Sequence, residues 1–402
     1  MAQTDTDAIA FVLSLAKALH RYGTPAHRLE EAIGVIALRL DLECDVFTTP
    51  TAIIMSFGEP TELRTRMLRV EGGELDMNKL EQVDDLADDV AGQKLSPAEG
   101  VARLDAILAG PRRYGPVVTT AMHAVTCSGM AVFFGGNLAE VALAGGIGVL
   151  LGILSTFAKR STDQARVFEL LGAAFVAFAA SCASSVFSIT PSLVTVAALI
   201  VLLPGMSLTV AMTELATRHL IAGTARLMSA VIVLLELVVG VALGERLARA
   251  IVHVHQAAAP VPLPKWSQRL ALIASSLGIA FVLQAQLRAF AWILAASAVG
   301  YIGSSLGTRW LDPQMGVVVG AFAVGVIGNA FARLMERPAQ VVQVPAMLLL
   351  VPGSMGFRGM ASLLGHDTLS GVETVFAMFV VAFAIVAGLL IANAVVSPRR
   401  SL

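Results

Sequence analysis

Two Pro-Gly pairs interrupt long apolar runs at matching places in the chain, and hydroxyl side chains follow each pair. The residues of these two breaks are Pro204, Gly205, Ser207 and Thr209 in the first, and Pro352, Gly353 and Ser354 in the second. Proline removes a backbone donor and clashes with the preceding helical turn, while glycine relaxes the local torsion angles. Inside a lipid bilayer, unpaired backbone groups are tolerated only where protein covers them or where they line a cavity. The breaks therefore predict free N–H and C=O groups, joined by hydroxyls, that could hold a carboxylate or an ammonium group.

For a single Pro-Gly pair, the simpler interpretation is a proline kink that only shapes a helix bundle. Here the pair is duplicated, and Pro352 stands 148 positions after Pro204. The duplication favours a substrate-binding or gating role in a protein built from two related halves.

Three further polar side chains stand inside apolar runs, where each is costly unless it has a function or a partner. Glu236 has no polar neighbour close to it in the sequence, so it is the strongest candidate for proton exchange; a partner for Arg226 or for a hydroxyl is the alternative. Asn329 lies among small residues, which suits either helix packing or substrate binding. His123 is a packing residue, a capping residue or a second proton carrier.

Charged residues near the ends of the apolar runs are interpreted as pairs or membrane anchors. Glu214 and Arg218 are four residues apart, so we expect an ion pair on one helix face. Arg288 and Arg358 lie near predicted membrane edges, where arginine more often anchors a helix than binds a ligand.

No residue pattern points to a metal, a cofactor or nucleic acid. The three cysteines, Cys44, Cys127 and Cys182, are widely spaced, without a Cys-x-x-Cys pair or a Cys/His cluster. We interpret them as small buried hydrophobes. No nucleophile elbow, metal-ligand pair or phosphate-binding loop occurs, so we expect no catalytic residues and no bound metal.

The composition is that of a membrane protein. The 402 residues are 56% hydrophobic and 14% charged, with a mean hydropathy of +0.77, against about 25% charged residues in soluble proteins. Residues 1–113 hold more acidic than basic side chains, whereas the remaining residues are net basic. This contrast predicts a boundary near residues 111–113 between a soluble acidic domain and a membrane domain.

Residues 1–113 are expected to form a small α+β domain. The expected elements are helices over residues 7–21 and 24–40, strands over residues 45–57 and 63–70, and two further helices. Thr24 is expected as the N-cap of the second helix, with Pro25 at its first position, and the last helix is expected to begin with a capping box at Ser96 and Glu99. The polar start of the chain lacks the basic and apolar regions of a secretory signal peptide, which places this domain in the cytoplasm. His20, His27 and nearby acidic residues could be imagined as a hydrolase site, but the missing motifs favour a structural or regulatory role.

Ten apolar runs in residues 114–402 are long enough to span a bilayer, which takes about 20 residues per helix. Residues 114–256 contain 117–135, 138–157, 167–186, 192–214 and 224–244, residues 267–402 contain 267–284, 287–305, 315–333, 340–362 and 371–394, and residues 257–266 form a proline-rich linker. The Pro-Gly pairs break the fourth run of each set. An odd number of spans per half makes the second half enter from the opposite side, so we expect an inverted repeat. More Lys and Arg fall in segments assigned to the inner side, which places both termini in the cytoplasm.

Motifs along nearly the whole chain resemble those of the threonine/serine exporter family. They are Tyr22-Gly23-Thr24 and Arg28-Leu29-Glu30, residues 46–53, residues 95–99, Phe134-Gly135-Gly136, residues 203–206 and residues 351–353. The resemblance implies efflux of threonine and serine from the cytoplasm, driven by the proton-motive force. Relatives split into two chains are associated with succinate export, and the cytoplasmic region of the family has been likened to a hydrolase.

We therefore expect a mainly α, polytopic helical protein of the inner membrane, with about ten spans in two inverted five-span repeats and an N-terminal cytoplasmic α+β domain. The expected function is export of threonine and serine by proton antiport, with alternating access around the two breaks. The alternatives are export of a dicarboxylate such as succinate, a membrane-anchored hydrolase that uses residues 1–113, and a passive channel. The membrane core contains no unambiguous buried Arg or Lys, which favours a net-neutral amino acid over a dicarboxylate. A homo-oligomer stays open.

Overall fold

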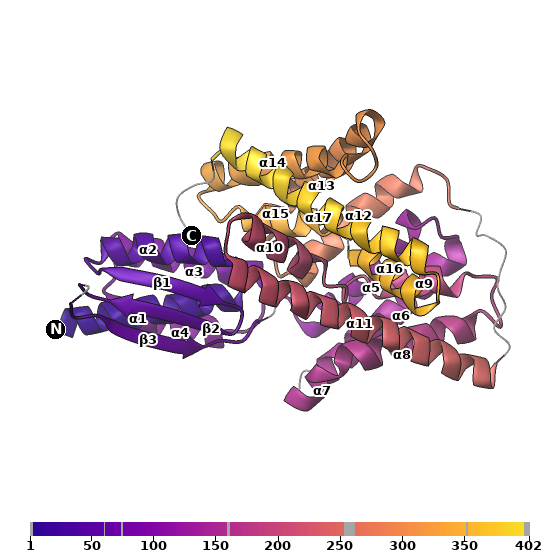
Figure 1. Cartoon of the computed structure of the whole chain (residues 1–402), viewed down its shortest axis with the longest axis horizontal. Coiled ribbons are helices and arrows are strands. Elements are labelled where there is room, and N and C mark those ends of the chain that lie inside the picture. Colours follow the sequence, from indigo (N-terminus) through magenta and orange to yellow (C-terminus); the bar gives the residue numbers. More distant parts are fainter. Residues whose placement is uncertain are drawn as a thin grey trace.

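The computed structural model describes residues 3–59, 61–73, 75–158, 161–252, 262–350 and 353–397. These residues form a mainly helical, elongated molecule (Figure 1). Residues 3–109, here called the N-terminal domain, lie at one end. A bundle of apolar helices makes up the rest.

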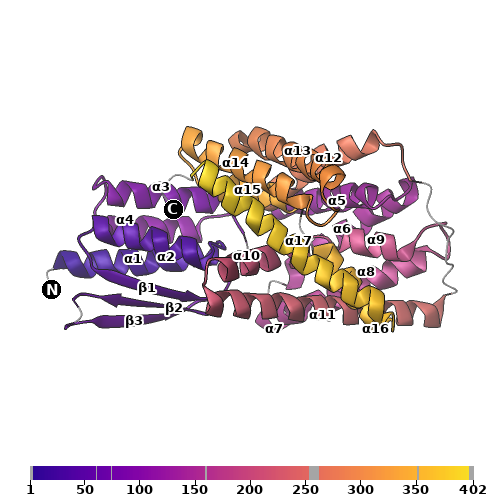
Figure 2. The same cartoon turned by 45° about the horizontal axis from the view of Figure 1, so that its top comes forward.

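The N-terminal domain contains four helices and a small antiparallel sheet. The elements are α1 (Gln3–Arg21), α2 (Ala26–Arg39), β1 (Cys44–Thr49), β2 (Ala52–Phe57), β3 (Arg64–Arg69), α3 (Met77–Ala91) and α4 (Pro97–Ala109). The strands pair in the order β1-β2-β3, and the helices lie on one side of the sheet (Figure 2). On β2 the alternate side chains of Ile53, Met55 and Phe57 are buried, because this face of the sheet covers the helical core.

Two expectations for this domain were wrong in detail. The single extended run expected over residues 45–57 is a hairpin of β1 and β2, because the chain turns after Thr49. The Thr49 hydroxyl stabilises the turn: it accepts from the Ala52 amide at 3.0 Å and donates to the Ala52 carbonyl at 3.1 Å. At the start of α2, Pro25 rather than Thr24 occupies the N-cap. The capping box of Ser96 and Glu99 is confirmed at the start of α4.

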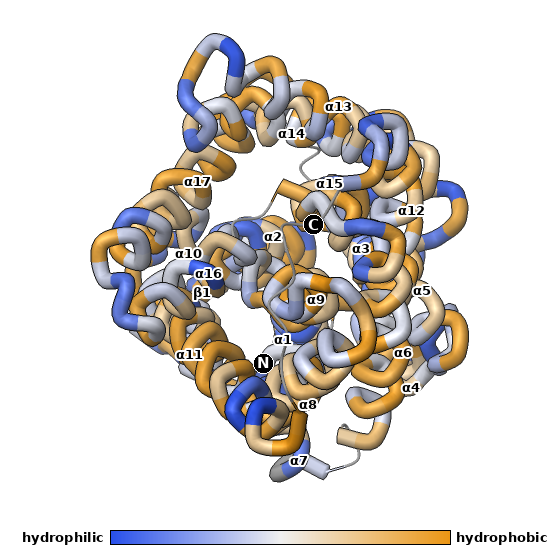
Figure 3. Tube along the Cα trace, turned by 90° about the vertical axis from the view of Figure 1, so that its right-hand side faces the viewer, coloured by the Kyte–Doolittle hydropathy of each residue, from blue (hydrophilic) through white to orange (hydrophobic). Residues whose placement is uncertain are grey.

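Six helices in the described residues are long and apolar enough to cross a membrane. They are α5 (Pro116–Phe133), α6 (Leu138–Ala158), α11 (Leu220–Ile251), α13 (Leu287–Trp310), α14 (Val317–Met335) and α17 (Thr368–Val395), while α8 (Phe168–Ala183) and α12 (Ser267–Val282) are apolar but shorter, and α7 (Thr162–Arg166) is a brief connecting helix. Large apolar side chains such as Leu154, Leu235 and Phe383 are exposed on the outer faces, and apolar residues run along these helices in Figure 3. An apolar surface of this extent suits lipid rather than water, so the chain is a multi-pass membrane protein.

The two apolar runs with Pro-Gly pairs are each split into two short helices. α9 (Pro191–Ala198) and α10 (Gly205–Ala216) flank the first break, and α15 (Gln340–Met347) and α16 (Gly353–Leu364) flank the second. Pro204 directly precedes α10, and its ψ of 40° is not that of a helix. Pro352 lies outside the described residues.

The two breaks lie against each other. A side-chain carbon added to Gly353 would lie 3.2 Å from Leu203 Cβ and 3.3 Å from both Cα and N of Gly205. The backbones approach this closely because the first residues of both α10 and α16 are glycine. From this shared start, α10 leads toward the N-terminal domain, whereas α16 leads to the turn after α5, where the Arg358 guanidinium lies 4.8 Å from the centre of the Phe134 ring.

Some close helix contacts occur twice in the bundle. Gly240 of α11 packs against the Leu170 carbonyl of α8, and Gly388 of α17 packs against the Val318 carbonyl of α14. The two members of the second contact each stand 148 positions after their counterparts in the first, which is also the spacing between the glycines of the two breaks.

Candidate functional site

A cavity of about 550 Å³ lies between the N-terminal domain and the membrane helices. Residues of α10, α11, α15 and α17 form one side of it, and the turn between α1 and α2, with the loops around Pro50 and Gly72, forms the other. A volume of roughly 300–1,000 Å³ is usual for small-molecule sites. Met206 and Ser207 belong to its lining, so the cavity reaches the first break.

Two predicted hydroxyls of the first break line this cavity, and the predicted hydroxyl of the second break does not. Ser207 and Thr209 are lining residues. The Thr209 hydroxyl donates to the Gly205 carbonyl at 3.1 Å, whereas the half-buried Ser207 side chain makes no hydrogen bond to another described residue. Ser354 is also half-buried but lies on α16, which leads away from the cavity.

Asn329 is fully buried behind the cavity wall, in a network of amides. Its Nδ2 donates to Asn393 Oδ1 at 2.8 Å and to the Val396 carbonyl at 2.7 Å, and its Oδ1 accepts from Gln343 Nε2 at 3.0 Å. Both Gln343 and Asn393 line the cavity. Asn329 therefore acts on the cavity by orienting these two side chains.

The two predicted proton carriers lie away from the cavity lining. Glu236 is half-buried on α11, and Glu169 of α8 interacts with it electrostatically. Its alternative partner, Arg226, binds Glu214 instead. His123 is half-buried on α5, and its Nδ1 hydrogen-bonds to the Thr119 carbonyl of the same helix at 2.8 Å.

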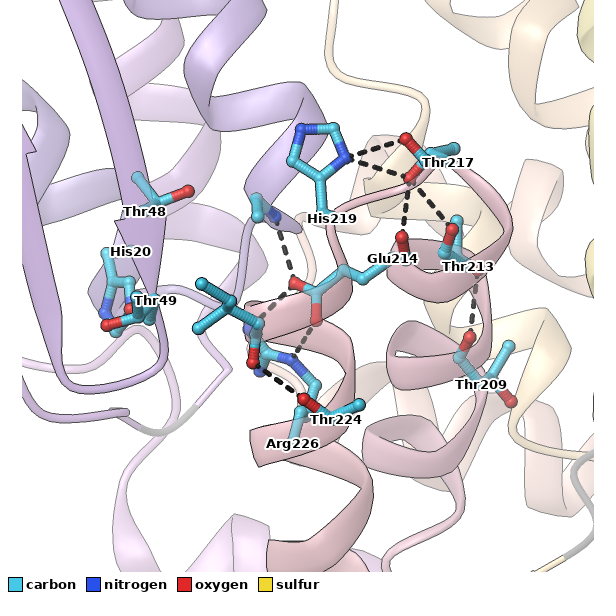
Figure 4. Close-up of polar contacts among 12 residues, drawn as sticks. His20, Thr48, Thr49, Thr209, Thr213, Glu214, Thr217, His219, Thr224 and Arg226 are labelled. Carbon is cyan, nitrogen blue, oxygen red and sulfur yellow. Dashed lines mark hydrogen bonds and ion pairs between the residues drawn. The ribbon is translucent and has the colours of Figure 1, made fainter.

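Glu214 joins α10, α11 and the N-terminal domain, as Figure 4 shows. The carboxylate is fully buried. It accepts from Arg226 Nε at 3.0 Å, from Arg226 Nη2 at 3.2 Å and from the Ala26 amide at 3.0 Å. The bidentate pair is a strong charge-assisted contact, and the bond to Ala26 supplies the first amide of α2 with the acceptor that Thr24 does not provide.

The expected pair of Glu214 with Arg218 was wrong. Helix α10 ends at Ala216, and Arg218 has a φ of 67°. The two side chains therefore do not share a helix face, and the four-residue spacing has no meaning there.

Further contacts attach the N-terminal domain to both halves of the bundle. On the α11 side, His219 Nε2 lies 3.1 Å from Glu30 Oε2. On the side of the second half, Arg288 Nη2 donates to the fully buried Glu81 at 2.5 Å, and Arg337 pairs with Asp85. The chain thereby holds the domain over the cavity.

The lining of the cavity is basic. Arg28, Arg226 and Arg337 belong to it, and no Asp or Glu of the described residues does. Burial lowers the pKa of His27 to about 4, and the neighbouring charge of Arg28 adds to the effect. Burial, together with Arg226, also lowers the pKa of His20. Both imidazoles are therefore uncharged near pH 7.

Three residues of the cavity lining were not predicted as site residues from the sequence: Arg28, Gln343 and Asn393. Gln343 and Asn393 stand in apolar runs, so the rule that found Asn329 could have found them. Arg28 had no such signal, because it belongs to an amphipathic helix of the soluble domain and reaches the cavity only through docking. Within the described ranges, no group of His, Cys, Asp and Glu could hold a metal ion.

Comparison with known families covers both parts of the chain. A family model described as a threonine/serine exporter matches residues 10–248. A second model, described as "Threonine/Serine exporter, ThrE", matches residues 268–395. No solved structure matches the chain significantly.

Curated relatives include yeast membrane proteins that share the name pheromone-regulated membrane protein 10. The protein of Saccharomyces cerevisiae is 29% identical, over 90% of this chain and 48% of its own length. The protein of Kluyveromyces lactis is 28% identical, over 88% of this chain and 38% of its own length. The chain thus spans half or less of the length of these relatives.

Proposed function

The chain belongs to the threonine/serine exporter family, and from this premise we propose that it is a secondary active exporter of threonine and serine. The observation that carries the proposal is the contact of the two breaks at Gly205 and Gly353, beside a cavity of small-molecule size. Broken helices that meet inside a bundle are a common construction for alternating access, in which one site opens to either side of the membrane in turn.

The proposed architecture has ten spans in two inverted five-span repeats. It counts the six long helices, α8, α12 and the two broken pairs. In support, the contact of Gly240 with Leu170 recurs as that of Gly388 with Val318, both residues shifted by 148 positions. Equivalent helices also run in opposite directions: α5 begins beside the N-terminal domain, whereas α12 ends there, with the Leu283 carbonyl accepting from the Met77 amide at 2.9 Å.

We place residues 1–113 in the cytoplasm, the two repeats at residues 114–256 and 267–402 in the inner membrane, and residues 257–266 between them. Asn393, near the end of α17, lines the cavity together with the N-terminal domain. The two ends of the described chain therefore lie on the same side of the bundle, as an even number of spans requires. The cavity then opens toward the cytoplasm, where an exporter collects its substrate.

The proposed binding site lies at the first break. Leu208 N bonds to the Pro204 carbonyl and Gly205 N to the Leu203 carbonyl, whereas the amides of Met206 and Ser207 make no backbone bond to other described residues. Free amides at a helix start carry a partial positive charge, which suits an oxygen atom of the solute, such as that of its hydroxyl group. The hydroxyls of Ser207 and Thr209 complete the site on this side, together with the side-chain amides of Gln343 and Asn393, which Asn329 orients. Ser354 and the second break, Pro352-Gly353, would serve it when the opposite side opens.

Glu236 is the proposed proton carrier, with His123 as a second. Glu236 interacts electrostatically with Glu169 of the neighbouring helix α8, so a change in its charge would be felt between the two helices. Neither carrier lines the cavity, so protonation would act on the packing of α11 against α8 rather than on the substrate.

The test is efflux of labelled threonine from proteoliposomes, with and without a pH gradient. We expect the gradient to accelerate efflux by the natural protein. Glu236→Gln should abolish that acceleration, whereas Glu245→Gln, half-buried on the same helix and paired with Arg249, should leave it intact. Efflux that ignores the gradient in the natural protein would indicate a passive channel. Transport of succinate without transport of threonine would indicate a dicarboxylate exporter.

A further inference from the structure

The N-terminal domain contributes polar side chains to the cavity that the transport mechanism leaves without a role. Arg28 comes from α2, and His20 comes from the last turn of α1. Both lie across the cavity from Ser207 and Thr209 of α10. The domain is therefore a wall of the cavity as well as a cover.

Arg28 carries the unneutralised positive charge of this lining. Arg226 is paired with Glu214, and Arg337 is paired with Asp85. Arg28 makes no hydrogen bond or close ion pair with any described residue; the negative charge that acts on it is that of Glu31 on its own helix. A guanidinium of this kind presents a planar fork of donors that matches a carboxylate.

His20 presents an acceptor. Its Nε2 lies 3.2 Å from the Thr49 carbonyl, and a carbonyl only accepts, so Nε2 carries the hydrogen. The lowered pKa of His20 keeps the ring neutral near pH 7, so Nδ1 has a free lone pair. This Nδ1 is buried without a partner among the described residues, although the residue is only 7% exposed and lines the cavity. An unpaired buried acceptor is costly unless a ligand satisfies it.

We propose that Arg28 and His20 of the N-terminal domain bind the transported solute directly. The Arg28 guanidinium takes the carboxylate, and His20 Nδ1 accepts a hydrogen bond from an ammonium or hydroxyl group of the same molecule. The ligand class is thus a small carboxylic acid that also carries a hydrogen-bond donor, such as an amino acid. A dicarboxylate would satisfy Arg28 but leave His20 unpaired at neutral pH. This assignment rests on the proposed function in one respect, namely that the cavity holds the transported solute.

The experiment measures binding to the purified full-length protein in detergent at pH 7.5, with three probes: L-threonine, L-threoninamide and succinate. Loss of a charge-assisted hydrogen bond costs about 1.5–3 kcal/mol, or about tenfold or more in affinity. We expect threonine to bind the natural protein at least tenfold more tightly than threoninamide. Arg28→Gln should lower the affinity for threonine about tenfold and leave the affinity for threoninamide unchanged. Arg39→Gln, an exposed arginine on the same helix, is the matched control.

The His20 arm separates a binding role from a structural one. His20→Leu should weaken the binding of threonine and threoninamide, which both carry a hydrogen-bond donor, and should leave the binding of succinate unchanged. His20→Gln should restore much of the affinity, because its amide can still donate to Thr49 and its oxygen can accept from the ligand. Equal loss of all three probes in His20→Leu would mean a role in folding only.

Three results would overturn the proposal: threonine bound equally by Arg28→Gln and by the natural protein, threoninamide bound as tightly as threonine, or none of the probes bound by the natural protein. The two proposals fail separately. Normal threonine efflux with unaltered binding in Arg28→Gln removes this assignment and leaves the exporter in place. Binding that follows the expected pattern, without any efflux, removes the exporter and leaves the assignment.

Discussion

The half-helices that follow the two breaks, α10 and α16, share a backbone plan and differ in their surroundings. Each has 12 residues and begins with a glycine that touches the other break. Yet α10 presents hydroxyls to the cavity and the buried Glu214 to Ala26 of the N-terminal domain. In contrast, α16 presents Arg358 to an aromatic ring at the far end. The positions of Glu214 and Arg226 are taken by Ser362 and Thr374 in the second half. The repeat thus specifies the backbone, and the neighbours of each copy decide its polar side chains.

The largest effect is expected where the two copies are alike. In Gly353→Val, the added atoms have no room beside Leu203 and Gly205. Overpacking of about 1–3 kcal/mol at a moving contact should reduce threonine efflux by about tenfold or more. Gly146→Val on α6, where an added carbon meets nothing within 4 Å, should transport normally. Natural efflux from a well-folded Gly353→Val protein would show that the breaks need no close contact.

The second test addresses the polar side chains in which the copies differ. Glu214→Ala leaves Arg226 without its partner and should cost about 3 kcal/mol of stability, seen as a lower melting temperature in detergent. Ser362→Ala, at the matching position, should cost less than about 0.5 kcal/mol. Replacing both partners, as in Glu214→Leu with Arg226→Met, should recover most of the loss. Equal losses at the two positions would remove the distinction between the halves.

A third test uses pH on the α10 side. The pKa of His27 falls from 6.5 to about 4 in the folded protein, so below pH 6.5 the unfolded chain binds a proton that the folded chain refuses. The free energy of unfolding should therefore decrease as the pH falls from 6.5 to 4, by up to about 3 kcal/mol. The melting temperature should therefore depend less on pH across this range in His27→Leu. It should keep the pH dependence of the natural protein in His366→Leu, a control beyond α16. A slope that is unchanged in His27→Leu would assign the titration to another group.

The smallest expected effect compares the two serines. Ser207 lines the cavity and Ser354 does not. Ser207→Ala should raise the apparent KM for threonine about fivefold, as loss of a hydrogen bond worth about 1 kcal/mol predicts. Ser354→Ala should leave the KM of cytoplasmic threonine unchanged. The opposite ranking would place the site at the second break.

Features that depend on local sequence were predictable. The Pro-Gly pairs foretold interrupted helices, and Ser96 with Glu99 foretold the start of α4, because proline geometry and capping act within a few residues. The partner of Glu214 was not predictable, since the choice of Arg226 over Arg218 depends on where α10 ends and how α11 returns beside it. The basic wall around Arg28 was equally inaccessible to sequence reasoning. It exists only because the N-terminal domain docks on the bundle.

That docking has a mechanical consequence. The N-terminal domain is bonded to one half through Ala26 and Glu30, and to the other through Glu81 and Asp85. Any rotation of one half against the other must stretch or break one of these two sets of contacts. The N-terminal domain therefore links the two halves and resists their relative rotation. These contacts add to the energy needed to leave the conformation seen here. Weakening those of Glu30 and Glu81, which do not line the cavity, is a way to change turnover while the lining side chains stay the same.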